Sequence, residues 1–184
     1  MDNLSLKWNF KLNVVSIPRS LNCFSDKISK CVDFEDYGVT DEFYELANLN
    51  SSIQCNFDRF ANNWNAKTAL FNSTSFCVGT SGVDCFNYNW GLDSVNWLFP
   101  PPRLVIKAVN HLMLCKARGL LLTPDWKAAH FYPFLMSTEI KKYTIKVLRF
   151  HGRNVFISGS DKSSYFGPEF NCGVKIWHLD FRLK

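Results

Sequence analysis

The stretch VNWLFPPPRLVIKAVNHLMLCKARGLLL, residues 95–122, carries the strongest structural signal in the chain. An apolar run at its start meets three prolines, which cannot continue the interior of a strand. Apolar residues then recur with helical spacing over residues 104–117, and Gly119 is well placed just past the helix end. Residues 120–122 are all leucine and indicate a buried parallel strand. Strand, helix and strand in this order predict a βαβ unit with a right-handed crossover.

Downstream of this unit the sequence predicts one aromatic connection and three further strands. Residues 124–135 indicate an aromatic loop or a short helix. Glycine turns separate the three strand candidates, which are residues 146–150, 155–158 and 174–181. We therefore expect an α/β fold with a mostly parallel, three-layer, Rossmann-like sheet that carries helices on both faces.

Upstream of the unit, acidic residues follow short apolar runs. Residues 53–58 form a strand-like run that ends at Asp58, and residues 83–86 indicate a second strand or a short helix around Asp84. Gly79 to Gly82 predict a loop between them. Open α/β sheets place ligand sites at the carboxyl ends of their strands, so we expect Asp58 and Asp84 to face one ligand crevice.

The N-terminal residues predict a strand and two helices. Apolar and polar residues alternate over residues 6–17, and Asn22 suits the N-cap of a short helix over residues 23–32. Thr40 begins a variant of the capping box ahead of a helix that ends near residues 48–50. We expect residues 6–30 to form a peripheral strand and helix that lack a parent sheet.

Composition indicates a globular, intracellular protein. A chain of 184 residues with 47% hydrophobic content can bury a core, and seven cysteines without a CxxC pair favour reduced thiols. No run reaches the ~20 apolar residues of a spanning helix, and the start lacks the apolar region of a signal peptide. We expect a location in the cytoplasm or nucleus and no membrane partner. The net charge of +5 permits weak contact with nucleic acid.

Several motifs in a fixed order resemble one family of mobile elements. They are FDRFANNWNAKTALF at residues 57–71, VDCF at 83–86 with Trp90, WLFPPP at 97–102, KARG at 116–119 and PDW at 124–126. Together they resemble the region downstream of the ribonuclease H in polyproteins of DIRS-type, tyrosine-recombinase retroelements. The resemblance implies a transposable-element origin beside a reverse transcriptase.

The N-terminal residues are similar to the end of that family's ribonuclease H. Residues 16–22 and 25–29 resemble its last strand and helix, where Asp26 matches the final metal-binding carboxylate. A two-metal site needs several oxygen ligands, so this single carboxylate cannot hold the metal pair. The resemblance implies a truncated ribonuclease H tail over residues 1–32, a linker helix over 33–53 and a methyltransferase-like α/β domain over 54–184.

The central block is similar to phage-type DNA adenine methyltransferases of the Dam group. Asp58 and Ala61 match a D-x-x-A string beside S-adenosylmethionine, Asp84 with Trp90 matches a second element, and Phe99-Pro100-Pro101-Pro102 occupies the catalytic tetrapeptide. The resemblance implies a cofactor site, which we expect to be vestigial. Its residues are Asp58, Ala61, Asp84, Phe99, Pro100 and Pro101.

The catalytic tetrapeptide departs from the family pattern at both ends. Amino-group methylation needs a side-chain oxygen that accepts from the adenine amine and an aromatic ring that holds the flipped base. Phe99 accepts no hydrogen bond, and Pro102 offers little stacking surface. We therefore expect no catalytic residues and no required cofactor, although binding of S-adenosylmethionine stays open. For Asp58, a capping or turn carboxylate at a strand end is an equal alternative.

Other chemistry has weaker support in the sequence. His111 and Cys115 lie four residues apart on the predicted helix, but no further residue has metal-ligand spacing, so we expect a buried cysteine beside an exposed histidine and no metal site. Motifs of serine hydrolases and phosphate loops are missing. We expect most aromatic residues to fill the core rather than to stack on bases.

These patterns lead to one main functional hypothesis and two alternatives. The main hypothesis is a non-catalytic accessory domain of a reverse transcriptase and ribonuclease H polyprotein, which packs on the upstream ribonuclease H and helps to hold nucleic acid. The first alternative is an active S-adenosylmethionine-dependent DNA adenine methyltransferase. The second is a decayed or domesticated transposon fragment without a separate activity.

Overall fold

The computed structural model describes residues 37–159 and 165–182, all of which belong to one compact unit. The expected strand at residues 6–17, the expected helix at 23–32 and Asp26 lie outside the described residues. Those parts of the sequence analysis therefore stay predictions.

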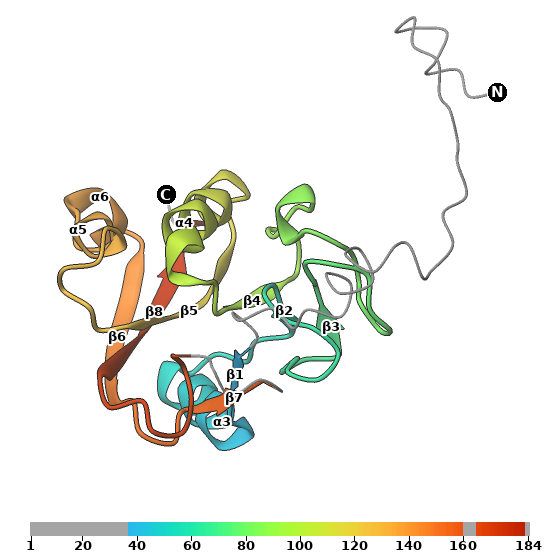
Figure 1. Ribbon diagram of the computed structural model, residues 1–184. Helices are drawn as coiled ribbons and strands as arrows, with labels where there is room; N and C mark the ends of the chain where they lie inside the picture. The colour runs from blue at the N-terminus through green and yellow to red at the C-terminus, as the bar shows by residue number, and fades with distance from the viewer. Residues whose placement is uncertain (1–36, 160–164, 183–184) are drawn as a thin grey trace, which may run out of the picture. The chain divides into compact units, whose positions relative to one another are not determined.

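The fold is mixed α/β, built on a six-stranded sheet that is partly parallel (Figure 1). Its strands lie in the order β3-β2-β4-β5-β8-β6, and the first four are parallel to one another. The last two strands, β8 and β6, are antiparallel to their neighbours. The strand bounds are β2 Phe57–Asp58, β3 Leu70–Phe71, β4 Val95–Leu98, β5 Arg118–Pro124, β6 Thr144–His151 and β8 Gly173–Asp180.

The βαβ unit expected at residues 95–122 is confirmed. β4 runs into the prolines, a single 3-10 turn η3 (Pro102–Leu104) follows, and helix α4 (Val105–Leu114) returns the chain to β5. β4 and β5 are adjacent and parallel, with Leu98 opposite Leu121. The prolines suit this place because the first turn of a helix leaves its N–H groups unbonded in any case.

The end of α4 differs from the prediction that Gly119 lies just past it. The helix ends at Leu114, and Lys116 takes the left-handed conformation with φ of 47°. The Lys116 N–H then donates to the Met113 carbonyl and the Ala117 N–H to the Leu112 carbonyl, which closes the helix in a Schellman motif. Gly119 instead lies within β5, opposite Asn96. A lysine thus takes the position for which glycine is the usual residue.

The sheet is covered on both faces, because side chains along each strand alternate between two cores. Trp97, Leu120 and Leu122 belong to the core on the side of α3. Leu98 and Leu121 belong to the core on the side of α4. Figure 1 shows α3 and α4 on opposite sides of the sheet. α4 contributes Val105, Ala108, Val109 and Leu112 to its core.

Helix α3 (Asp41–Ser51) begins where the sequence predicts. Thr40 is its N-cap, and the Thr40 hydroxyl accepts from the Phe43 N–H at 3.2 Å. The helix falls in the stretch expected as a linker, residues 33–53. Its buried face packs on the sheet, where the ring of Tyr44 meets Trp97 edge to face at 5.1 Å between centroids.

The three C-terminal strand candidates are confirmed as β6, β7 (Phe156–Ser158) and β8. β7 leaves the main sheet and pairs antiparallel with β1 (Tyr37–Val39), a strand that the sequence analysis did not anticipate. The aromatic connection expected at residues 124–135 contains the short helix α5 (Phe131–Leu135), and α6 (Thr138–Lys141) follows it. None of the helices within the described residues has the length and apolar character needed to cross a bilayer.

Replacement of Gly119 by alanine tests the close approach of β4 and β5. A Cβ atom at Gly119 would lie 2.2 Å from the backbone oxygen of Asn96, so the strands would have to separate. We expect Gly119→Ala to lower the free energy of unfolding by about 2–3 kcal/mol in urea denaturation, the usual cost of overpacking.

Gly173→Ala is the matched control, since it also lies in the sheet. Its Cβ would meet no atom closer than 3.6 Å, so its stability should change by less than about 1 kcal/mol. Equal losses in the two variants would contradict the close contact.

Candidate functional site

The carboxyl ends of β2 and β4 form the candidate site. Asp58 ends β2 opposite Trp97 of the parallel strand β4, and Phe99 follows the end of β4. Both Asp58 and Phe99 therefore reach the same edge of the sheet, where they line one small cavity of about 10 Å³. The lining residues are Tyr37, Gly38, Val39, Asp58, Phe60, Asn65, Lys67, Trp97 and Phe99.

The carboxylate of Asp58 is buried, and each of its oxygens accepts a backbone N–H. Its Oδ1 accepts from the Phe60 N–H at 3.2 Å, and its Oδ2 accepts from the Lys67 N–H at 3.1 Å. Burial raises the pKa of Asp58 to about 6, and the hydrogen bonds from Lys67 and Phe60 oppose this rise. Asp58 thus organises the loop of residues 59–67 as a turn carboxylate, the second of the two readings that the sequence allows.

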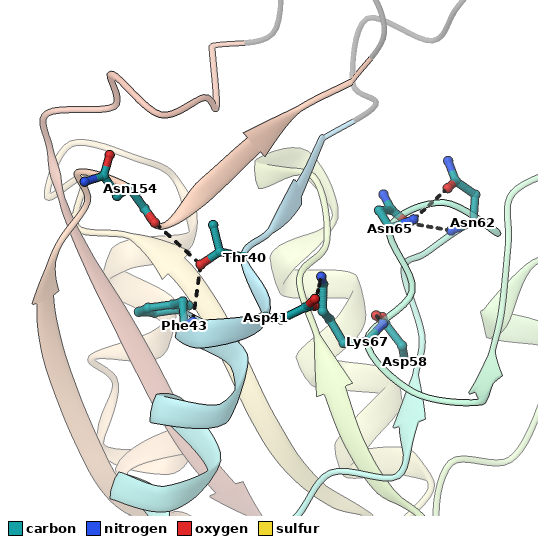
Figure 2. A network of polar contacts seen from close by, with 8 residues as sticks. All are labelled: Thr40, Asp41, Phe43, Asp58, Asn62, Asn65, Lys67 and Asn154. Carbon is teal, nitrogen blue, oxygen red and sulfur yellow. Dashed lines mark hydrogen bonds and ion pairs between the residues drawn. The ribbon is translucent and has the colours of Figure 1, made fainter.

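Asparagines complete the loop that Asp58 holds (Figure 2). The Asn62 N–H donates to the Asn65 side-chain oxygen at 2.7 Å, and the Asn65 N–H donates back to the Asn62 side chain at 3.3 Å. The Asn65 side-chain amide donates to the Tyr37 carbonyl at 2.8 Å, which ties the loop to β1. Figure 2 also shows Lys67 reaching Asp41 at the start of α3, at 2.6 Å. The polar groups around Asp58 are therefore bonded to one another.

Phe99, which stands in the catalytic tetrapeptide of the resemblance, packs in an aromatic cluster. Its ring stacks on Phe156 at 5.3 Å between centroids and meets Tyr37 at 5.0 Å and Phe166 at 5.7 Å. The side chain is buried, as is that of the following residue, Pro100. Pro101 is half-buried at the start of η3. The ring of Phe99 is thus part of the core on the α3 side of the sheet.

The other expected site residues lie elsewhere. Ala61 is buried, and its N–H donates to the Asn72 carbonyl past the end of β3. Asp84 is exposed, has φ of 54° and caps a 3-10 turn, η2 (Cys85–Asn87), through a hydrogen bond from the Phe86 N–H. The structure therefore brings Asp58 and Phe99 together, whereas Asp84 does not line their cavity. Trp126 of the PDW motif does not line it either.

The buried Arg59, which the sequence did not single out, links the strands at the same edge through its hydrogen bonds. Arg59 Nε donates to the Asn96 side-chain oxygen at 2.7 Å, and Arg59 Nη1 donates to the Asn72 side-chain oxygen at 3.0 Å. Its guanidinium lies 3.5 Å from the centroid of the Phe57 ring. Burial lowers the pKa of Arg59 to about 10. The polar Asn96 inside the apolar run VNWLF was the signal that could have indicated a buried network.

A second buried cation lies on the α4 side of the sheet. Lys175 of β8 is 1% exposed, and its Nζ donates to the Tyr132 hydroxyl at 2.9 Å. Nζ also lies 2.7 Å from Asp125 Oδ1, an ion pair whose angles fall outside hydrogen-bond geometry. This pair fastens the start of the connection after β5 to the middle of the sheet. Neither residue lines the cavity beside Asp58.

The pair His111 and Cys115 makes contact without forming a metal cluster. Cys115 Sγ lies 3.5 Å from His111 Nε2, but the same nitrogen lies 2.8 Å from the Tyr88 carbonyl. A nitrogen that donates to a carbonyl cannot also accept the thiol proton. No group of three or more His, Cys, Asp or Glu side chains within the described residues could hold a metal ion.

Comparison of the chain with protein-family models and with curated proteins gave no match. The resemblance to DIRS-type polyproteins therefore stays a prediction that rests on the ordered motifs of the sequence.

The ionisation of Asp58 predicts how stability depends on pH. Because its pKa is raised above that of the unfolded chain, its contribution to stability is present at low pH and is lost as the pH rises through about 6. Relative to Asp58→Asn, the wild-type protein should therefore gain about 1 kcal/mol in free energy of unfolding between pH 7 and pH 5.

Urea denaturation of both proteins at several pH values measures this difference. The titration of every other group affects both proteins equally, so it cancels when the two free energies of unfolding are subtracted. Asp84→Asn, which alters an exposed capping carboxylate, is the control for loss of a negative charge. A difference between wild type and Asp58→Asn that stays constant from pH 7 to pH 5 would refute the effect.

A double-mutant cycle tests how much the ion pair of Lys175 and Asp125 contributes to stability. Asp125→Ala leaves a buried ammonium without its counter-charge and should cost about 3 kcal/mol of stability. The double variant Asp125→Ala/Lys175→Met removes both charges, so it should be more stable than Asp125→Ala alone. Chemical denaturation of the single and double variants tests this order, and simple addition of the two single costs would contradict it.

Proposed function

We propose that this chain is a non-catalytic accessory domain of a retroelement polyprotein that also carries a reverse transcriptase and a ribonuclease H. In this role it assists the handling of nucleic acid. The single observation that carries this proposal is the hydrogen bonding of Asp58. Both of its carboxylate oxygens accept backbone N–H groups of its own loop, so the carboxylate matched to cofactor binding already serves the fold.

The size of the cavity beside Asp58 also supports a structural role. Pockets for small molecules usually enclose roughly 300–1,000 Å³, whereas this cavity of about 10 Å³ is close to the space of one water molecule. A ligand as large as S-adenosylmethionine would have to displace the loop that Asp58, Asn62 and Asn65 hold together. That displacement would break the hydrogen bonds of a buried carboxylate, which is costly.

The packing of Phe99 argues against the methyltransferase alternative. Transfer to an adenine amine needs an oxygen acceptor at this position, and loss of one preorganised polar contact raises a barrier by about 3–4 kcal/mol. The Phe99 ring is also stacked on Phe156 within the core, so it does not project toward a substrate. An α/β fold whose candidate site is occupied by its own aromatic side chains and loop fits an accessory domain better than an enzyme.

We also propose that the body of the protein descends from a mostly parallel, three-layer, Rossmann-like fold. The parallel order β3-β2-β4-β5 supports this descent, as do α3 and α4 on opposite faces. Asp58 and Phe99 meet at the carboxyl edge, where such folds bind ligands. The remaining proposals are a ribonuclease H tail at residues 1–32, an intracellular location and packing on an upstream ribonuclease H.

Titration calorimetry with S-adenosylmethionine separates the accessory domain from the methyltransferase. We expect no binding heat at micromolar concentrations of the cofactor, because the cavity is too small and Asp58 is engaged. A micromolar heat signal that Asp58→Ala abolishes would overturn this part of the proposal. Asp84→Ala is the matched control, because its carboxylate lies away from the cavity.

Binding of an oligonucleotide tests the nucleic-acid role and separates it from a decayed fragment. We expect weak binding that falls steeply from 50 to 200 mM salt, because phosphate contacts release counterions. No binding at 50 mM salt would refute the role in nucleic-acid handling.

A further inference from the structure

We propose that the outer edge of the sheet is the surface that binds nucleic acid, and that its ligand is single-stranded. This edge, called the basic edge below, runs from the end of α6 along β6 to the turn after it. The inference rests on the proposed nucleic-acid function and names its site. The basic edge comprises Lys141, Lys142, Lys146, Arg149 and Arg153.

The basic edge concentrates positive charge without an acidic residue among it. From residue 140 to residue 160 the sequence has five lysines and arginines and no aspartate or glutamate. All five side chains are exposed, and so is His151 between them. They lie on one continuous segment, which Figure 1 places at the end of the sheet opposite β3. Side chains alternate along a strand, so Lys146 lies on one face of β6 and Arg149 on the other, on either side of the outer edge. Exposed cations that flank an extended edge attract a polyanion.

Acidic residues do lie on the elements next to this edge, Glu42 and Glu45 on α3 and Glu139 on α6, but none of them is paired with it within the described residues. Asp41 at the start of α3 is paired with Lys67, and Asp125 is paired with the buried Lys175. Within the described residues no ion pair includes a member of the basic edge. Lys146 Nζ donates to the carbonyl of Asn50 at the end of α3, which leaves its charge uncompensated.

The edge is poorly suited to accept another β-strand. β6 has one neighbour, β8, and its register shifts between Thr144 and Lys146, so Ile145 forms an irregularity in the outermost strand. Bulges and lysines on an outer strand prevent strand addition and edge-to-edge pairing. Charged ligands are therefore favoured over a second copy of the chain.

Apolar side chains between the cations favour a single strand over a duplex. Ile145 and Val147 are 54% and 39% exposed, on either side of Lys146. Unpaired bases offer their flat faces to such side chains, whereas a duplex stacks those faces inside. The eight residues of β6 span about 26 Å at roughly 3.3 Å per residue. That length suits a short stretch of nucleotides, comparable with the smallest single-strand sites of about four nucleotides.

Fluorescence anisotropy with a labelled oligo-dT tests the site on the full chain. Lys142→Gln/Arg149→Gln should weaken binding at least about fivefold at 50 mM salt. It should also reduce the slope of log affinity against log salt by about 1.4, which corresponds to two lost phosphate contacts on a single strand. The control Lys107→Gln/Lys116→Gln removes two exposed charges, one on α4 and one just past its end, and should change the affinity less than about twofold.

A second variant examines the apolar contacts separately from the charges. Ile145→Ser/Val147→Ser should weaken binding of the oligo-dT severalfold while the salt slope stays unchanged, because no phosphate contact is lost. Unchanged thermal unfolding of each variant shows that a lost affinity does not come from a lost fold.

The outcomes separate the site from the function. Equal losses in the edge and control variants would overturn the site while leaving nucleic-acid binding in place. Tighter binding to a duplex of equal length, or to vesicles of anionic lipid, would overturn the single-strand ligand. No binding by the wild-type protein would overturn the proposed function itself.

Discussion

The arrangement of the sheet depends on the hydrogen bonds of the buried Asn96 side chain. Its oxygen accepts from Arg59 Nε of the chain leaving β2, and its amide donates to the carbonyls of Trp90 and Arg118. One buried amide thus links β2, β4, β5 and the segment before β4. Hydrogen bonds in a dry interior are strong, and their loss leaves costly unpaired groups, so this amide fixes the strands in one register. Gly119 permits the approach, because any larger residue would strike the backbone of Asn96.

The edge beside this network uses its polar groups for structure. In an open α/β sheet the carboxyl ends of parallel strands leave polar groups free for a ligand. Here Asp58 accepts from the backbone of Phe60 and Lys67, and Asn62 and Asn65 accept from each other's backbone. Phe99 fills the adjoining space with aromatic packing. An acidic side chain at the place of a ligand site can therefore hold a loop, and only its hydrogen-bond partners distinguish the two roles.

Acidic and basic residues are separated along the sequence. Residues 33–58 contain seven acidic residues and no basic residue, whereas residues 140–160 contain five basic residues and no acidic one. The first stretch includes α3, whose Asp41 is paired with Lys67. The second forms the exposed edge at β6. The small net charge of the whole chain therefore conceals two stretches of opposite charge.

The sequence by itself determined the local elements. Periodicity fixed β4, α4 and β5, Thr40 marked the start of α3, and glycine turns separated the three C-terminal strands. These features depend on neighbouring residues, whose spacing and sterics act within a few turns of chain. The end of α4 was misjudged because glycine is the usual residue after a helix, and here the left-handed position holds Lys116.

Tertiary structure alone decided which elements pair and what each polar residue does. β7 pairs with β1 rather than with a strand of the main sheet. Lys175 forms an ion pair with Asp125, fifty positions earlier, and Arg59 donates to the side chain of Asn96 on the neighbouring strand. Many pairings of similar energy exist for short strands, and the choice among them depends on the packing of the whole core. For the same reason Asp58 could be recognised in the sequence as a candidate, but its role as a turn carboxylate became visible only with its partners in place.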